Sequence, residues 1–267
     1  MDALPDVAYV YMVRCTGGQL YTGWTNHPAA RLKAHQSGKG ARYTRAHGAV
    51  GFAYLERCAD KRAALRREAA LKKLPKPEKE ALAAQWTAEN TITLRDAAPE
   101  DAAAVAELYN WYVTHSTATF QYDLCTEEFQ RENIAYVQQR APFLVAVNAA
   151  GKLCGFACAH PWHSRTAYAW DVELTVYCAH DCVGQGVGGR LYKALLDGVR
   201  QRGYCNAVAL VTGQNKESCA FHKALGFKKI GMEPRTGYKF GQWLDLAYWW
   251  MDLRPGQEPP EPVRLGR

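Results

Sequence analysis

A buried strand followed by a glycine-rich turn, near the middle of the chain, restricts the fold more than any other feature of the sequence. The strand is the apolar run 172–178, and after a short loop the turn carries Gly184, Gly186 and Gly189. The residues from there to Arg202 have the pattern of a helix. Such a turn exposes several backbone N–H groups at a helix N-terminus, where they can hold a pyrophosphate. We therefore expect a cofactor that carries a diphosphate at this turn.

The glycine spacing also matches the fingerprint of dinucleotide-binding folds, but its surroundings do not. In those folds the glycines follow the first strand directly, and a carboxylate stands about twenty residues further on. Here five residues separate the strand from Gly184, and the next strand, 207–212, ends without an acidic residue. These observations argue against a nicotinamide dinucleotide as the cofactor.

Positive charge is concentrated in the first third of the chain. Residues 1–86 hold 15 Lys and Arg against 7 Asp and Glu, whereas residues 87–267 hold 18 against 19. This asymmetry indicates a polyanion such as nucleic acid as partner of the first part, and a small-molecule reaction in the second. The nine cysteines include no Cys-x-x-Cys pair, and no apolar run approaches the length of a membrane span. We expect reduced thiols, no membrane partner and a cytoplasmic location.

Apolar runs, turn residues and helix signals divide the chain into two α/β (α+β) domains and a tail. We expect one domain over 1–86, a second over 87–253, and a disordered tail over 254–267. The first has a three-stranded sheet in which strand 50–56 is apolar enough to be central. The other expected strands are 8–14, 19–24, a short one from Thr91, 143–148, 153–160, 167–178, 207–212, 227–232 and 243–251. The expected helices are 28–36, 60–74, 77–85, 99–115, 126–139, 188–202 and 216–225.

Further segments of the second domain accompany the glycine turn. Asn215-x-x-Ser218 and the run 221–227 follow it, and with it they resemble the GCN5-related N-acetyltransferase (GNAT) family over about 91–253. The segments 117–120, 165–168, 172–177 and 239–245 resemble its phosphinothricin and methionine-sulfone acetyltransferase subgroup. The resemblance implies a mixed sheet flanked by helices, acetyl-CoA as cofactor, a small amino-acid-like amine as substrate and a homodimer. The acetyl-CoA-binding positions it implies are Val176, Val183, Gly184, Gln185, Gly186, Val187, Gly188, Gly189, Asn215 and Ser218, with Val183 where the family usually has Gln or Arg.

Glu173 is a carboxylate on an otherwise apolar strand, at the edge of the expected cofactor site. Burial raises the pKa of such a group and makes it a usable base for an amine, and the resemblance implies the same role through a water molecule. The alternative is a buried glutamate paired with a nearby cation, because an unpaired buried carboxylate is unfavourable. The amide of Val176 or Tyr177 is the candidate donor to the thioester carbonyl.

The expected substrate contacts come from Phe120, Arg165 and Tyr168, which lie in the subgroup-like segments. The guanidinium fork of Arg165 suits a substrate carboxylate, and we place Tyr168 further along the same face of the predicted strand. The alternative for these two residues is a surface arginine and a core tyrosine.

Three tyrosines and a glycine open the first domain in a predicted hairpin. Tyr9-x-Tyr11 and Tyr21-x-Gly23 alternate so that all four can share one face of the sheet. Arg31 and His35 follow one helical turn apart and share a helix face.

This constellation, with Glu68 and the segment 37–44, resembles the GIY-YIG nuclease family over about 9–82. The match implies Tyr11 and Tyr21 near the attacking water, Arg31 on the scissile phosphate, His35 as a proton-transfer or phosphate group, and Glu68 as ligand of Mg²⁺, which often takes a single protein carboxylate. No conventional Asn or Lys partner follows Glu68. The alternatives are plain aromatic packing, or a module that binds nucleic acid without cleaving it. That module would bind phosphates through Lys33, Lys39, Arg42 and Arg45.

Overall fold

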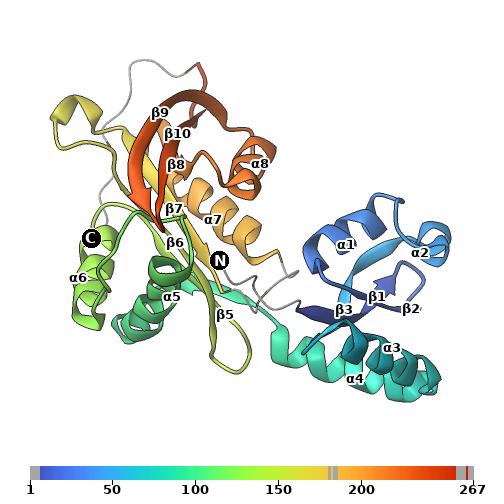
Figure 1. Cartoon of the computed structure of the whole chain (residues 1–267). Coiled ribbons are helices and arrows are strands. Elements are labelled where there is room, and N and C mark those ends of the chain that lie inside the picture. The colour runs from blue at the N-terminus through green and yellow to red at the C-terminus, as the bar shows by residue number, and fades with distance from the viewer. Residues whose placement is uncertain (1–6, 180–181, 183–185, 257–262, 264–267) are drawn as a thin grey trace. The chain divides into compact units, whose positions relative to one another are not determined.

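The computed structural model describes residues 7–179, 182, 186–256 and 263. Contacts within the chain divide it into two compact units, and the main division falls between Thr93 and Leu94 (Figure 1). The boundary expected after residue 86 lies inside a helix, α4 (Lys76–Asn90), so the helix expected over 77–85 is longer at its C-terminal end. Trp86 explains the extension, because its indole N–H donates to the carbonyl of Leu55 at 3.0 Å and holds this turn on the first unit. Most of the expected tail lies outside the described residues.

The sheet of the first unit has three antiparallel strands in the order β2-β1-β3: β2 (Leu20–Thr25), β1 (Ala8–Cys15) and β3 (Ala49–Cys58). The expectation that the third strand is central was wrong. The strand β1 pairs with both neighbours and is the most deeply buried of the three, whereas most residues of β3 are only partly covered. The central strand therefore carries Tyr11 into the middle of the unit.

Four helices accompany this sheet: α1 (Pro28–Gln36), α2 (Arg42–His47), α3 (Lys61–Lys73) and α4. Asp60 caps α3 as its position suggests, because its carboxylate accepts the N–H of Ala63 at 2.7 Å. Leu71 of α3 packs with Val10 of β1 in one core cluster. The short helix α2 was not among the expected helices.

The second unit is built on a seven-stranded mixed sheet in the order β4-β5-β6-β7-β8-β10-β9 (Figure 1). The pair β7–β8 is parallel, whereas β5–β6, β6–β7, β8–β10 and β9–β10 are antiparallel. The strands are β4 (Thr93–Asp96), β5 (Phe143–Val147), β6 (Leu153–Pro161), β7 (Asp171–Cys178), β8 (Asn206–Thr212), β9 (Lys228–Lys239) and β10 (Gln242–Asp252).

Helices flank both faces of this sheet. Val187 and Leu191 of α7 (Val187–Gln201) lie against Gly155 of β6. The next residue of that strand, Phe156, points to the opposite face, which α5 (Ala102–His115) and α6 (Glu127–Gln138) cover. A fourth helix, α8 (Lys216–Ala224), follows β8, and the single turns η1 (Pro99–Asp101) and η2 (Thr166–Tyr168) complete the unit. The expected α/β architecture, with a mixed sheet between helices, is confirmed.

Two strand predictions in this unit were wrong. The strand expected over 167–178 begins only at Asp171, because the chain leaves the sheet after Trp162, whose N–H bonds the carbonyl of Asp171 at 3.2 Å, and the intervening loop contains η2. The strand β9 extends seven residues past its expected end at Met232. Pro234 reads as a strand breaker, but β9 is the edge strand of the sheet, where proline is tolerated.

Candidate active site

The strands β7 and β8 separate in the middle of the second unit and open a cavity. Their parallel pairing ends at Glu173 and Val208, after which β8 continues beside β10 and β7 beside β6. The backbone of β7 from Leu174 onward therefore has no strand partner on the β8 side. Val176 and Tyr177, the expected amide donors to a carbonyl, lie along this opening.

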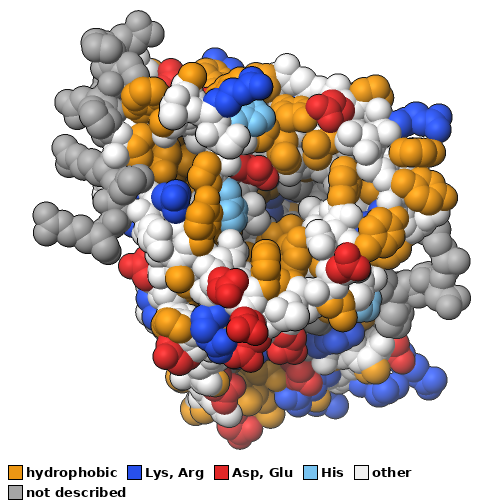
Figure 2. Space-filling view, turned by 90° about the vertical axis from the view of Figure 1, so that its left-hand side faces the viewer, with side chains coloured by type: hydrophobic (Ala, Val, Ile, Leu, Met, Phe, Trp, Pro, Cys, Tyr) orange, Lys and Arg blue, Asp and Glu red, His pale blue; other side chains and the backbone are white. Residues whose placement is uncertain are grey.

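The cavity measures about 730 Å³ and is mostly apolar, with polar groups from several elements. Figure 2 shows the hollow on this face of the molecule, bordered by hydrophobic side chains together with acidic and histidine side chains. The polar and titratable residues of its wall are Tyr109, Thr119, Gln121, Cys125, Thr126, Gln130, Asn133, Cys158, His160, Glu173, Thr175, Tyr177, Thr212, Asn215, Ser218 and His222. Among the described residues this wall contains Glu173 as its one acidic side chain and no Lys or Arg.

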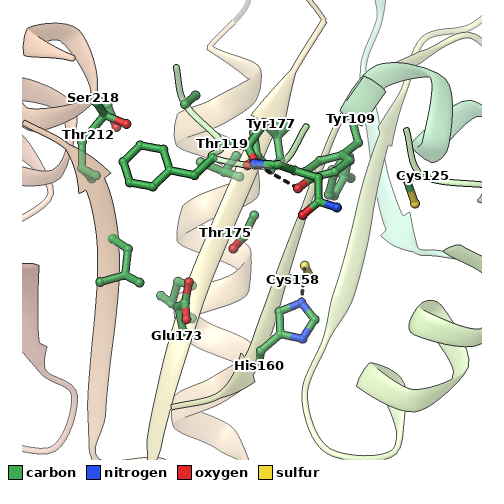
Figure 3. Close-up of a pocket in the computed structure, with 18 of the residues that line it drawn as sticks. Tyr109, Thr119, Cys125, Cys158, His160, Glu173, Thr175, Tyr177, Thr212 and Ser218 are labelled. Atoms are coloured by element: carbon green, nitrogen blue, oxygen red, sulfur yellow. Dashed lines mark hydrogen bonds between the residues drawn. The ribbon is translucent and has the colours of Figure 1, made fainter. Parts of the chain in front are cut away.

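Glu173 projects from β7 into the cavity (Figure 3). Burial raises the pKa of its carboxyl group. Within the described part of the chain its side chain has no hydrogen bond and no ion pair, so the alternative of a glutamate paired with a cation is not what the structure shows. A carboxylate with a raised pKa that faces an open cavity can accept a proton from a bound amine.

His160 and Cys158 of β6 share the cavity wall with Glu173, and the sequence analysis did not single them out. His160 Nε2 lies 3.5 Å from Cys158 Sγ, and burial lowers the pKa of the imidazole. Burial and the nearby Glu173 together raise the pKa of the thiol to about 12. The alternation of side chains along β6 was the available signal, but only the pairing with β7 shows which face these two residues occupy.

The loop 116–125 forms one side of the cavity and is held from beneath by a buried lysine. Lys239 Nζ donates to the carbonyls of Ser116 and Thr119, each at 2.8 Å, and burial lowers the pKa of this ammonium group. Phe120 lines the cavity, as expected for a substrate contact. Its ring approaches Gly237 so closely that a Cβ there would lie 2.5 Å from it.

The other two expected substrate residues do not line the cavity. Arg165 lies exposed at the start of η2, and Tyr168 packs on His163 with ring centroids 4.6 Å apart. Because residues 166–168 form a helical turn, Tyr168 does not follow Arg165 along a strand face as expected.

Helix α7 begins beside the strands of the cavity. The glycines at its N-terminus leave room for a ligand to approach the backbone closely. Gly186 has a φ of +66°, and a Cβ on Gly188 would lie 3.2 Å from Cys178 Sγ, whereas Gly189 faces open space. Val187 is buried. The expected contacts Val183, Gly184 and Gln185 lie outside the described residues.

Asn215 and Ser218 complete the cofactor side of the cavity. The Asn215 side chain caps α8 by accepting the N–H of Ser218 at 3.0 Å, and both residues line the cavity. His222, one turn further, donates from Nδ1 to the carbonyl of Ser218 at 2.8 Å and accepts the hydroxyl of Tyr192 at 3.1 Å. A helix N-terminus, small residues and a neighbouring cavity together fit a pyrophosphate and the thioester arm attached to it.

The first unit contains a second cluster, in which a chain of hydrogen bonds joins three of the expected site residues to Thr44. Arg31 Nε donates to Tyr11 Oη at 3.0 Å, Tyr11 Oη lies 2.8 Å from His35 Nε2, and His35 Nδ1 lies 2.6 Å from Thr44 Oγ1. The Thr44 hydroxyl donates to the carbonyl of Ala41 at 3.0 Å. Its oxygen must therefore accept from Nδ1, which leaves Nε2 to accept the proton of Tyr11.

Burial sets the electrostatics of this cluster. It raises the pKa of the Tyr11 phenol, partly offset by the Arg31 guanidinium, and with Arg31 it lowers the pKa of His35 to about 4. Tyr21 lies on the same face, with its ring centroid 5.3 Å from that of His35. A neutral imidazole that faces a phenolic proton, beside a fixed cation, suits proton transfer next to a phosphate.

The residues present offer little to a metal ion. Glu68, the expected Mg²⁺ ligand, bonds Lys72 at 2.8 Å, and the described residues contain no group of three His, Cys, Asp or Glu that could hold a metal. They do not fit a closed metal site, so we derive no step through Mg²⁺.

Two family models match the chain. The GIY-YIG catalytic domain matches residues 7–81, and the acetyltransferase (GNAT) domain matches residues 94–248. Among the described residues no helix is long and apolar enough to cross a membrane.

Curated proteins similar to this chain carry acetyltransferase names. A phosphinothricin N-acetyltransferase of Streptomyces viridochromogenes is 36% identical over 173 residues, which cover 65% of this chain and 93% of that protein. An L-methionine sulfoximine/L-methionine sulfone acetyltransferase of Pseudomonas paraeruginosa is 33% identical, with 64% of this chain and 99% of that protein covered. These matches span the second unit.

Solved structures resemble the same part of the chain. A GNAT-superfamily phosphinothricin acetyltransferase of Sinorhizobium meliloti, solved with acetyl-CoA, aligns with a TM-score of 0.61 and 31% identity over 66% of this chain and 99% of that one. An N-acetyltransferase of Staphylococcus aureus aligns with a TM-score of 0.59 and 29% identity over 61% and 99%.

Proposed function

We propose that this chain, which belongs to the GNAT family of N-acetyltransferases, transfers the acetyl group of acetyl-CoA to the amine of a small amino-acid-like substrate. The observation that carries the proposal is the position of Glu173, a carboxylate that has no cationic partner among the described residues and faces the cavity where β7 and β8 separate. The names of its relatives support phosphinothricin or methionine sulfone and sulfoximine as the class of substrate. The solved relative with acetyl-CoA supports the acetyl donor.

Each part of the site then has a task. The N-terminus of α7, with Asn215 and Ser218 opposite, would hold acetyl-CoA, which supplies a thioester-activated acetyl group when bound. Glu173 takes a proton from the substrate ammonium, directly or through water, and burial, which raises its pKa, makes the carboxylate a stronger acceptor of that proton. The amide of Val176 or Tyr177 lies where β7 has no strand partner on the β8 side and can donate to the thioester carbonyl.

A thiol-release assay with acetyl-CoA and a panel of amino acids tests this function. The panel includes methionine sulfone, methionine sulfoximine and phosphinothricin. We expect turnover by the wild type, a loss of about 100-fold or more in Glu173→Gln, and retained acetyl-CoA binding in that variant. Glu107→Gln makes the same change at an exposed position of α5 and should keep full activity. Equal turnover by Glu173→Gln would remove Glu173 as the base.

The first unit supports a second function, hydrolysis of a nucleic-acid phosphodiester. The observation that favours it is the chain from Arg31 through Tyr11 to His35, in which the tyrosine proton points at a neutral imidazole. His35 can accept this proton as Tyr11 activates water, and Arg31 can neutralise charge that develops on the phosphate. The match of residues 7–81 to the GIY-YIG catalytic domain supports the same activity.

Cleavage of labelled DNA and RNA by the full chain, with and without Mg²⁺, tests this second function. We expect products that are lost in Tyr11→Phe, whereas Glu78→Ala, exposed on α4, keeps them. Products that require Mg²⁺ and are lost in Glu68→Ala would identify Glu68 as a metal ligand despite its ion pair with Lys72. Binding that weakens with salt, without cleavage in the wild type, would instead support a module that only binds nucleic acid.

The resemblance to the phosphinothricin subgroup also supports a homodimer of the second unit. Sedimentation velocity of the full chain checks this part of the proposal, since a species of one chain at micromolar concentration would exclude a stable dimer.

A further inference from the structure

His160 occupies the position directly across from Glu173 in the antiparallel pair β6–β7. Residues paired in this way point to the same face of a sheet, with Cβ atoms about 5 Å apart. Both side chains line the cavity, and Figure 3 shows them side by side on neighbouring strands, facing the same space. A substrate amine within reach of one is therefore within reach of the other.

Cys158 holds the imidazole in this orientation. Its Sγ lies 3.5 Å from His160 Nε2, and Cys158 is buried. Within the described residues the other ring nitrogen, Nδ1, has no hydrogen-bond partner, and this atom is not fully buried. Nε2 of the ring thus faces the sulfur, and Nδ1 faces the cavity.

The chemistry of acetyl transfer to an amine releases two protons from one nitrogen. The substrate enters as an ammonium ion with three N–H bonds and leaves as an amide with one. The nitrogen forms a C–N bond to the acetyl carbon as the C–S bond breaks, and the electron pair of that bond goes to sulfur. One released proton ends on the thiol of CoA and the other in solvent, so two acceptors at the nitrogen serve the reaction better than one.

We propose that His160 and Glu173 act together as a proton-accepting pair at the substrate amine, each taking one of the two protons that the nitrogen releases. This inference rests on the acetyl transfer proposed above. Glu173 takes the ammonium proton and frees the nucleophile. His160 takes the second proton as the amide forms, and its Nε2–H then points to Cys158 Sγ.

The cavity has other titratable groups besides this pair and Cys158. They are Tyr109 of α5, Cys125 before α6, Tyr177 of β7 and His222 of α8. Across the sheet, Tyr248 of β10 feels the charge of Glu173 but donates to Glu233 at 2.6 Å. Of these groups only His222 is a second imidazole, so it is the group from which His160 must be distinguished.

A titration followed by NMR tests the pairing without any need for turnover. Imidazole ¹⁵N signals of the full chain are recorded against pH, and the His160 signal is assigned by its loss in His160→Gln. We expect Glu173→Gln to lower the pKa of His160 by about one unit, because an ionised carboxylate stabilises the imidazolium beside it. His115, exposed at the end of α5, is the control, and its signal should not differ between the two proteins. Superimposable His160 curves in the two proteins would overturn the pairing.

The pH profile of kcat/KM gives the second readout. With two acceptors that must both be unprotonated, the acid limb of the wild-type profile is steeper than a single ionisation allows. We expect His160→Gln to reduce the limb to one ionisation and the rate by about tenfold or more, with acetyl-CoA binding retained. His115→Gln is the matched control and leaves rate and profile unchanged. If His222→Gln, and not His160→Gln, removes the ionisation, the assignment is wrong.

The two readouts separate this inference from the function on which it rests. Silence across the whole amine panel would count against acetyl transfer, whereas the NMR titration alone decides whether His160 and Glu173 are coupled. A slower His160→Gln enzyme with the wild-type profile would show a structural role and overturn the second acceptor.

Discussion

Lys239 Nζ lies 2.8 Å from the carbonyl oxygen of Thr119, and this buried contact ties the edge strand β9 to the loop that forms one side of the cavity. The same ammonium group also bonds the carbonyl of Ser116. One side chain thus satisfies two backbone acceptors of the loop that carries Phe120 into the cavity. The lysine therefore controls the shape of the cavity without lining it.

We expect Lys239→Met to loosen this loop. The variant leaves two carbonyls without a donor, which costs about 1–3 kcal/mol of folding free energy, and it should raise KM for the amine more than it lowers kcat. Chemical denaturation and steady-state kinetics measure the two effects. Lys228→Met, at an exposed position of β9, is the control. A variant with wild-type stability and KM would show that the loop holds its shape without the lysine.

The contrast between Glu173 and Lys239 shows what the sequence could predict. Glu173 stands out as a charge in an apolar strand next to a glycine turn, so local pattern was sufficient. Lys239 lies in a segment with Pro234 and Gly237, whose presence argues against a strand in the sequence. The carbonyls to which it donates belong to residues about 120 positions away in the chain. His160 could not be predicted as a cavity residue for a different reason, because only the register with β7 shows which face of β6 it occupies.

The placement of Arg165 was the sequence prediction that depended most on tertiary structure. Its motif matches the subgroup, yet whether the side chain reaches a cavity depends on how the loop 162–170 leaves the sheet, which no local pattern encodes. The first unit was easier, since Tyr11, Arg31 and His35 come from a strand and a helix that follow each other closely. Their assembly needed one hairpin and one helix start.

The charge of the cavity wall leads to a prediction about substrates. Among the described residues the wall carries Glu173 and no Lys or Arg, so an anionic side group would enter without a cationic partner. We expect kcat/KM for methionine sulfone to exceed that for phosphinothricin by about tenfold or more, which corresponds to about 1.4 kcal/mol. Initial rates of thiol release at matched concentrations measure this ratio. A preference for phosphinothricin would indicate a cation from elsewhere, and a reversal of that preference in Arg165→Gln would identify it.

The buried His35 makes the stability of the first unit depend on pH. Its pKa in the folded protein is about 4, against an ordinary value of 6.5. Between these pH values the unfolded state binds more protons than the folded state. The contribution of His35 to the free energy of unfolding is therefore fully present above about pH 6.5 and is lost as the pH drops towards 4. The difference amounts to about 3 kcal/mol. Hydrogen exchange of β1 and α1 amides in the full chain, at pH 7 and pH 4.5, measures it, and an unchanged protection pattern after correction for intrinsic rates would contradict the buried neutral imidazole.

Gly40 offers a more local test of the same cluster. A Cβ at this position would lie 2.4 Å from His35 Nδ1 and 2.7 Å from its Cα, and the backbone atom cannot move aside as a flexible side chain can. We therefore expect Gly40→Ala to break the bond from His35 to Thr44, to move the titration of His35 towards its ordinary pKa, and to destabilise the first unit by about 1–3 kcal/mol. Gly51→Ala is the matched control, because a Cβ there meets nothing within 4 Å and its backbone needs no positive φ. Imidazole NMR and hydrogen exchange compare the two variants. Equal behaviour of both would mean that the turn before α2 yields to the methyl group and that Gly40 does not fix the histidine.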